Sequence, residues 1–200
     1  EDLVAIGYDR ENAGRIAGLL SDTQQLQWYL SRGARMDCYP LSRAGERYPQ
    51  RLRQRLGMDC PGCLWTKGDT SLLTKPAVAL VGSRDMAPEN LAFAREAGRQ
   101  AALQGYVLVS GNARGADRAA QEACLEYGGQ VVSVVADCLE EHPLRRNVLY
   151  LSEDSFDAAF TAQRALSRNR VIHCLADPVL VAQCTCGKGG TWDGTSKNLR

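Results

Sequence analysis

The sequence predicts an α/β fold, with a Rossmann-like, mostly parallel sheet that is flanked by helices and preceded by a small helical and irregular N-terminal segment. Apolar, strand-like runs at 77–83, 106–111 and 130–136 alternate with helix-like segments at 87–105 and 113–129. Two consecutive βαβ units of this kind require right-handed crossovers and parallel strands. The chain has 200 residues with 44% hydrophobic content, which is enough for one sizeable core.

The first 74 residues lack the alternation of strands and helices that the rest of the chain shows. Residues 11–35 read as one or two short helices, the second of which opens on a cap at Asp22 and Thr23. Prolines and glycines then punctuate short elements up to residue 74. We therefore expect an N-terminal helical and lead-in segment over residues 1–74 and a Rossmann-like domain over residues 75–200.

The α/β pattern starts at the apolar run AVALVGS, which is typical of a strand buried on both faces. The helix that follows has Pro88 near its first turn and Gly105 after its last turn. Beyond the third strand we expect a polar stretch with a helix at 142–154, a helix at 160–176 and a strand at 178–184. The chain then ends in a glycine-rich loop and the first turn of a helix.

Composition limits the kinds of partner. The formal net charge is only +1, so any nucleic-acid site must be local and cannot be a general basic coat. Arginine outnumbers lysine by 20 to 4, and arginine grips phosphates in a bidentate fork. The apolar runs are too short to cross a bilayer, so the sequence predicts a cytoplasmic protein with no membrane partner.

The eight cysteines are expected to be reduced thiols. Cys60 and Cys63 have the spacing of a metal knuckle or a redox motif, and Cys184 and Cys186 offer two further thiols. The first pair, however, lies in a Pro/Gly turn, and buried cysteine is often a small hydrophobe. We expect neither a metal nor a cofactor.

Three glycine-containing loops follow predicted strands, where open α/β sheets bind their ligands. Glycine lets backbone N–H groups approach an anion, a hydroxyl adds a donor, and a helix N-terminus adds a favourable dipole. The loops therefore predict a phosphate-binding rim. Its candidate residues are Gly82, Ser83 and Arg84 in the first loop, Ser110, Gly111, Asn112, Arg114 and Gly115 in the second, and Gly189, Gly190 and Thr191 in the third.

Further arginines suit several phosphates in a row. Arg168 and Arg170 lie in LSRNRVI, and Arg145 and Arg146 lie in PLRRN. The alternative for Arg168 and Arg170 is a pair on a helix surface that serves solubility.

The loops fit no familiar catalytic motif. GSRDMA lacks the second and third glycines of the dinucleotide fingerprint, and GKGGT lacks the spacing of a Walker A loop. No serine lies on a G-x-S-x-G elbow, so the sequence predicts binding without catalysis. Of the two histidines, His142 reads as a loop residue and His173 as a semi-buried helix residue. Asp117 reads best as a helix cap.

The run from Tyr48 to Thr191 resembles the DprA/Smf DNA-processing family. The matching pieces occur in order: RYPQRL and LWTKGDTSLL, then VALVGSR, then VLVSGNARGADRAAQEACLEYGGQVVSVVA, and finally SRNRVIHCLADPVLVAQC. Members of this family bind single-stranded DNA and load the RecA recombinase during natural transformation.

The resemblance implies that Arg84, Ser110, Gly111 and Arg114 contact strand phosphates. Arg168, Arg170 and Lys188 would extend that surface, and either Arg145 or Arg146 would match the family's basic residue after the third strand. It also implies single-stranded DNA as a partner, a RecA-type recombinase as a possible second partner, and a possible homodimer.

The loop GGTWDGT departs from the family pattern and indicates a variant branch. Small relatives of the same fold bind nucleotides or nucleotide-derived ligands. A protein or hydrolase that binds a free nucleotide therefore stays open as the alternative function.

Overall fold

The computed structural model describes residues 2–5 and 7–198, which form two units that divide between Met36 and Asp37. The first unit consists of helices α1 (Asp2–Ala5), α2 (Arg10–Ser21) and α3 (Thr23–Arg35). The carboxylate of Asp9 accepts a hydrogen bond from the backbone of Asn12, and that of Asp22 accepts one from Gln25. The predicted cap at Asp22 is therefore confirmed.

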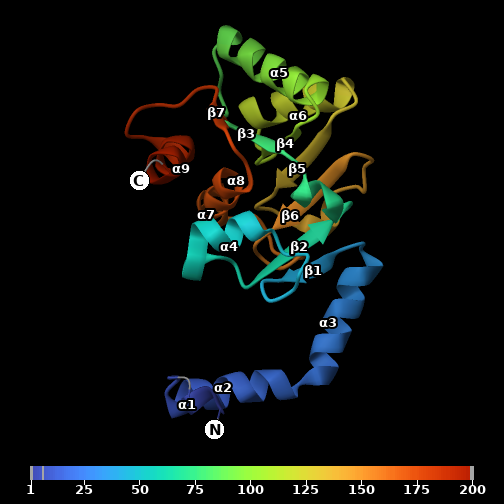
Figure 1. Cartoon of the computed structure of the whole chain (residues 1–200), viewed down its shortest axis with the longest axis vertical. Helices are drawn as coiled ribbons and strands as arrows, with labels where there is room; N and C mark the ends of the chain where they lie inside the picture. The colour runs from blue at the N-terminus through green and yellow to red at the C-terminus, as the bar shows by residue number, and fades with distance from the viewer. Residues whose placement is uncertain (1, 6, 199–200) are drawn as a thin grey trace. The chain divides into compact units, whose positions relative to one another are not determined.

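The second unit is built on a seven-stranded sheet with the order β1-β2-β6-β5-β4-β3-β7 (Figure 1). β1 and β2 pair antiparallel, as do β2 and β6, and every other pair is parallel. The predicted fold class, a mostly parallel Rossmann-like sheet flanked by helices, is confirmed. The strands are β1 (Tyr39–Ser42), β2 (Cys63–Lys67), β3 (Ala77–Val81), β4 (Val107–Ser110), β5 (Gln130–Val134), β6 (Val148–Ser152) and β7 (Val179–Val181).

Helices cover the sheet in two layers (Figure 1). α5 (Pro88–Leu103) and α6 (Ala116–Glu126) pack together and lie against β3 and β4. α8 (Asn169–Leu175) also contacts β3 and β4, and α4 (Gln50–Leu56), α7 (Ala162–Ser167) and α9 (Gly189–Asn198) pack against α8. Short 3-10 turns lie at Gly57–Asp59, Thr70–Thr74 and Leu139–Glu141.

The core forms where α4 and α8 meet the sheet. Its fully buried side chains include Leu52, Leu64, Leu149, Leu151 and Ile172. Every residue of β3, β4 and β6 is buried, as the continuous apolar runs of a sheet covered on both faces require. Among the described residues, no helix is both long and apolar enough to span a membrane.

Strands β1 and β2 lie before residue 74, in the part of the chain that the sequence predicts to be an irregular lead-in. They continue the sheet beyond β6 and share its core through Leu41 and Leu64. The observed division thus lies near residue 36, whereas the expected boundary lay at residue 74. Both strands are short, and a proline interrupts the first, so neither has a clear two-residue alternation.

Three further expectations about elements are corrected. The helix expected at 142–154 is the buried strand β6 with its preceding loop, because its apolar residues pair with β5 on one side and β2 on the other. The single helix expected at 160–176 is two helices, α7 and α8, which meet at Arg168. The expected single turn after the glycine loop is the ten-residue helix α9.

Candidate functional site

The cavity that the first and third glycine loops line, hereafter the main cavity, lies at the switch point of the sheet. β3 is the first parallel strand in the chain and lies between β4 and β7. The segments that follow β3 and β7 lead to helices of different layers, α5 and α9. Open α/β sheets bind ligands in the crevice beyond the carboxyl ends of such strands. Here that crevice is a cavity of about 520 Å³, lined by the segments after β3 and β7, by α8 and by the first turn of α9.

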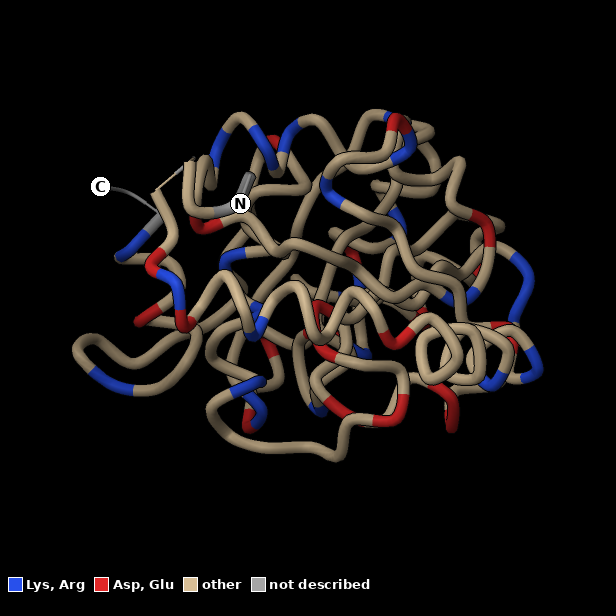
Figure 2. The backbone as a smooth tube through the Cα atoms, turned by 90° about the horizontal axis from the view of Figure 1, so that it is seen from below, with Lys and Arg blue, Asp and Glu red and all other residues tan. Residues whose placement is uncertain are grey.

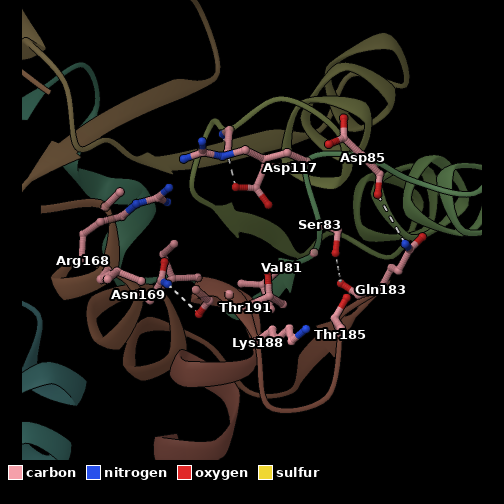
Figure 3. A pocket seen from close by; sticks show the side chains of 18 of the residues that line it. Val81, Ser83, Asp85, Asp117, Arg168, Asn169, Gln183, Thr185, Lys188 and Thr191 are labelled. Carbon is pink, nitrogen blue, oxygen red and sulfur yellow. Dashed lines mark hydrogen bonds between the residues drawn. The ribbon is translucent and has the colours of Figure 1, made fainter. Parts of the chain in front are cut away.

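The segments after β3 and β7 are tied together on one side of the cavity (Figure 3). The backbone N–H of Ser83 donates to the carbonyl of Gln183 at 2.9 Å, and the Ser83 hydroxyl donates to the same oxygen at 3.1 Å. The side-chain oxygen of Gln183 accepts from the backbone of Ala87 and from Asn90, each at 2.9 Å. Gln183 therefore fixes the loop that carries Ser83 and Arg84.

A buried carboxylate and a buried guanidinium lie deeper in the cavity. Asp117, which is 5% exposed, accepts hydrogen bonds from the backbone N–H of Gly111 at 3.1 Å and of Ala113 at 3.3 Å. Arg168, which is 7% exposed, donates to the carbonyl of Val134 at 3.0 Å. Both side chains line the cavity, and their opposite charges interact electrostatically.

Burial shifts the proton equilibrium of both groups. It raises the pKa of Asp117 to about 6, against the opposing effects of Arg168 and of the two backbone donors. It lowers the pKa of Arg168, whereas the carboxylates of Asp117 and Asp137 act in the opposite direction. Asp117 therefore changes charge in the range where a pH experiment is practical.

Two glycines make these close approaches possible. The guanidinium of Arg168 occupies the position that a Cβ on Gly111 would take. Gly115 has a φ of +88°, and a Cβ there would lie 2.5 Å from the carbonyl oxygens of Ser83 and Arg84. The glycines of the second loop thus allow Arg168 and the backbone of the first loop to pack closely against it.

The cavity is lined by more cationic than anionic side chains. Arg84, Arg168 and Lys188 line it, as do Asp85 and Asp117. Among the described residues, Arg84 and Lys188 have no ion-pair partner, whereas Asp85 pairs with Arg114 at 2.5 Å. In Figure 3, Lys188 and Thr191 lie along the lower side of the hollow, with Arg168 on one flank and Ser83 on the other. Such an arrangement suits an anion.

Basic and acidic residues are mixed along the rest of the chain. Figure 2 shows basic and acidic positions interspersed along the chain. This pattern agrees with the net charge of +1.

The structure brings about half of the predicted rim together. The predicted residues that line the main cavity are Gly82, Ser83, Arg84, Arg168, Lys188, Gly189, Gly190 and Thr191. Arg168 therefore does not form the surface pair that was the alternative for it.

The second loop contributes less to the cavity than the sequence suggested. Ser110 is fully buried and accepts a hydrogen bond from Gln121 at 2.8 Å. The side chain of Arg114 is 72% exposed and turned to Asp85. Gly111 and Gly115 act through packing, as described above, and Asn112 lies at a separate cavity of about 640 Å³ beside α6.

The remaining arginines lie away from the main cavity. Arg145 and Arg146 precede β6, and β6 runs parallel to β5, so they lie toward the opposite end of the sheet. Arg145 also lines the cavity beside α6. Arg170 does not line the main cavity and pairs with Glu153 at 2.6 Å. The four predicted arginine positions therefore do not all line one cavity.

Sequence reasoning missed several residues of the cavity. Asp117 is turned into the loop as an acceptor, whereas it was expected to serve mainly as a helix cap. The side chain of Asn169 donates to the carbonyl of Gly190 at 3.1 Å and so holds the first turn of α9. Gln183, Thr185 and His173 also line the cavity. Gln183 lies near the end of the strand predicted at 178–184 and Thr185 lies directly after it, and only this position at a strand end could have indicated them.

The cysteines gather at no metal site. Among the described residues, no group of three or more His, Cys, Asp or Glu side chains is placed to hold a metal ion. All eight cysteines are free thiols, and Cys60 lies 3.1 Å from the hydroxyl of Tyr48.

Comparison with known families gives a match over most of the second unit. The family model described as DNA recombination-mediator protein A matches residues 41–194. The chain is 32% identical to DNA processing protein DprA of Streptococcus pneumoniae over 163 residues, which are 76% of this chain and 54% of that protein. The chain thus spans about half the length of that curated relative.

Two solved structures share the fold. The crystal structure of DprA from S. pneumoniae superposes with a TM-score of 0.81 at 26% identity, covering 99% of this chain and 71% of that one. DprA from Helicobacter pylori, whose structure concerns its single-stranded-DNA binding mode, superposes with a TM-score of 0.65 at 26% identity. That match covers 81% of this chain and 77% of the other.

Proposed function

Because the chain belongs to the DNA recombination-mediator protein A family, we propose that it binds single-stranded DNA and acts in DNA processing or recombination. The structural study of the H. pylori relative concerns the binding of single-stranded DNA, and that relative shares the fold of this chain. The proposal transfers this ligand to the present chain.

The cavity at the switch point is the observation that carries the proposal. A DNA phosphate that enters it would meet the side chains of Arg84 and Lys188, which have no ion-pair partner among the described residues. It would also meet Arg168 and the first turn of α9, where backbone N–H groups and the helix dipole favour an anion. The positive charge of these side chains would attract the DNA phosphates, and binding of this kind does not depend on which bases the DNA carries.

Binding of a fluorescent thymidine oligonucleotide, followed by anisotropy, tests this proposal. We expect Arg84→Ala and Lys188→Ala each to weaken binding by roughly tenfold, since a hydrogen bond to a charged group is worth about 1.5–3 kcal/mol. Arg95→Ala removes an exposed arginine of α5 that does not line the cavity, and it is the matched control. Equal affinity of all three variants and the unmodified chain would contradict the proposal.

A free nucleotide is a second candidate ligand, and the size of the cavity favours it. About 520 Å³ lies within the range of about 300–1,000 Å³ that small-ligand sites occupy. A thermal-shift series with nucleotides beside oligonucleotides separates the two, because only a true ligand stabilises the folded state by mass action. A shift with a nucleotide and none with an oligonucleotide would select the second candidate.

A RecA-type recombinase is the protein partner that the family's description as a recombination mediator supports. Co-elution of this chain with a purified RecA-type protein on an oligonucleotide would support the partnership. The same size-exclusion experiment without DNA measures whether the chain forms a homodimer.

A further inference from the structure

His173 is a buried imidazole without a hydrogen-bond partner. It is 2% exposed, and neither Nδ1 nor Nε2 has a partner in the described part of the chain. Leaving a buried donor unsatisfied costs about 1–3 kcal/mol, so such groups are rare and call for a physical explanation. Among the described residues no carboxylate is hydrogen-bonded to the imidazole, and burial lowers its pKa below the ordinary value for histidine.

The imidazole borders the cavity described above. His173 lines the main cavity and also a second one of about 1360 Å³, which lies between α4, α8 and α9. The two cavities share Leu166, Gly189 and Gly190 as well, so His173 lies where they meet. Its Nε2 lies 3.4 Å from the position of a Cβ on Gly194, which places that side of the ring against α9.

A second buried donor of the same cavity is also unpartnered. The Nε of Arg168 has no hydrogen-bond partner among the described residues, although its Nη1 donates to Val134. Two unsatisfied buried donors that line one cavity point to a ligand that accepts hydrogen bonds there.

Burial is the cause of the lowered pKa of His173. Arg168, Arg170 and Cys174 are its titratable neighbours along the chain. The charged groups that line the two cavities from the other elements are Arg84, Asp85, Asp117, Lys188, Asp193, Lys197, Arg55, Asp59 and Asp177. A phosphate that entered the main cavity would therefore add the negative charge that the imidazole lacks.

We propose that His173 is a further phosphate ligand of this cavity and takes up one proton from solvent when a DNA phosphate binds. The inference rests on the proposed function, since it names a residue of the same site. The proton adds to the free ring nitrogen, so that both nitrogens become donors and no other bond changes. DNA affinity therefore rises as the pH falls.

The size of this effect is bounded by linkage. One proton taken up on binding changes the affinity by at most about tenfold per pH unit, within the window between the free and the bound equilibrium of the group. Asp117 also lines the cavity and favours an anion more when it is protonated, so part of the pH dependence belongs to it. The test must separate the two groups.

Proton NMR of the imidazoles separates them directly, because the chain contains only two histidines. The variant His142→Asn leaves the resonances of His173 alone and so assigns them. We expect the midpoint of the His173 titration to move to higher pH when a saturating thymidine oligonucleotide is added. A midpoint that is the same with and without the oligonucleotide would overturn the inference.

The variant His173→Gln gives a second readout, since glutamine keeps a hydrogen-bond donor but cannot take up the proton. Between about pH 8 and pH 6 we expect the unmodified chain to gain several-fold more affinity than this variant, with the remaining gain due to Asp117. An equal gain in both proteins overturns the role of His173 and leaves the proposed function intact. Absence of oligonucleotide binding at either pH overturns the proposed function itself.

Discussion

Position 111 requires glycine because the side chain of Arg168 leaves no room for a Cβ. The guanidinium of Arg168 fills the space of a side chain at this position, so Gly111→Ala must displace a buried charge. We expect a loss of about 1–3 kcal/mol in the free energy of unfolding, which is the usual cost of overpacking, together with weaker oligonucleotide binding. Urea denaturation measures the first effect. Gly62→Ala is the control, because a Cβ there meets nothing within 4 Å; equal losses would contradict this account.

Asp117 should make stability depend on pH. Burial raises its folded-state pKa to about 6, so between the ordinary value of a carboxyl and that value the folded protein binds more protons than the unfolded chain. Its contribution therefore favours the folded state below that window and is lost as the pH rises through about 6. We expect Asp117→Asn to flatten this decline in urea midpoints, whereas Asp193→Asn should not. A decline of the same size in Asp117→Asn would contradict the assignment.

At the level of single residues, the sequence predicts the first loop and the glycine loop well, because both follow directly from recognisable strand ends. It predicts Arg145 and Arg170 poorly. The position of Arg145 depends on the direction of β6, and that of Arg170 depends on its ion pair with Glu153. Both features are determined by residues that are distant in the chain. Asn169 and His173 lie on the face of α8 that packs against α9, and no local sequence pattern identifies this contact.

Among the elements, β6 is the clearest case in which distant residues decide. Leu151 is fully buried between neighbouring strands, whereas Leu144, in the loop before β6, is 59% exposed. Leu151→Ala should cost about 2–5 kcal/mol of unfolding free energy, as for a large-to-small change in a packed core. Leu144→Ala should change it by less than about 0.5 kcal/mol. A surface helix at 142–154 would give small effects at both positions.

Helix α9 rests on α7 and α8 through its glycines. A Cβ on Gly190 would lie 2.9 Å from a methyl carbon of Leu166, and one on Gly194 would lie 3.1 Å from the Cβ of Asn169. Gly190→Val should therefore release α9, with faster amide exchange over 189–198 and unchanged exchange in β3 to β6. Lys197→Val, on the exposed side of α9, is the control. Unchanged protection of α9 in Gly190→Val would show that the glycines do not set its position.

For the elements as a set, alternation of apolar runs with helical segments predicts β3, α5, β4, α6 and β5. These segments carry complete local signals, including Pro88 at the start of α5. β2 and β6 are as long as β3, but they pair with each other although they lie far apart in the sequence, and β1 contains a proline. Their place in the sheet could not be read from local patterns.

At the scale of the whole molecule, the unit that begins at Asp37 contains the sheet and its core. Of the residues that the structure describes, none before Leu41 belongs to the buried cluster of that core. A fragment of residues 37–200 should therefore unfold at the same urea concentration as the full chain and bind a thymidine oligonucleotide with the same affinity. A lower midpoint would show that the N-terminal helices stabilise the sheet.

The central claim is that a few cations at the switch point bind DNA phosphates, and the salt dependence of binding tests it most directly. Each phosphate contact to a single strand adds about 0.7 to the slope of log affinity against log salt concentration. The double variant Arg84→Ala, Lys188→Ala should therefore lower that slope by roughly 1.4, whereas Arg95→Ala, on the exposed face of α5, should leave it unchanged. An unchanged slope in the double variant, with DNA still bound, would contradict the account.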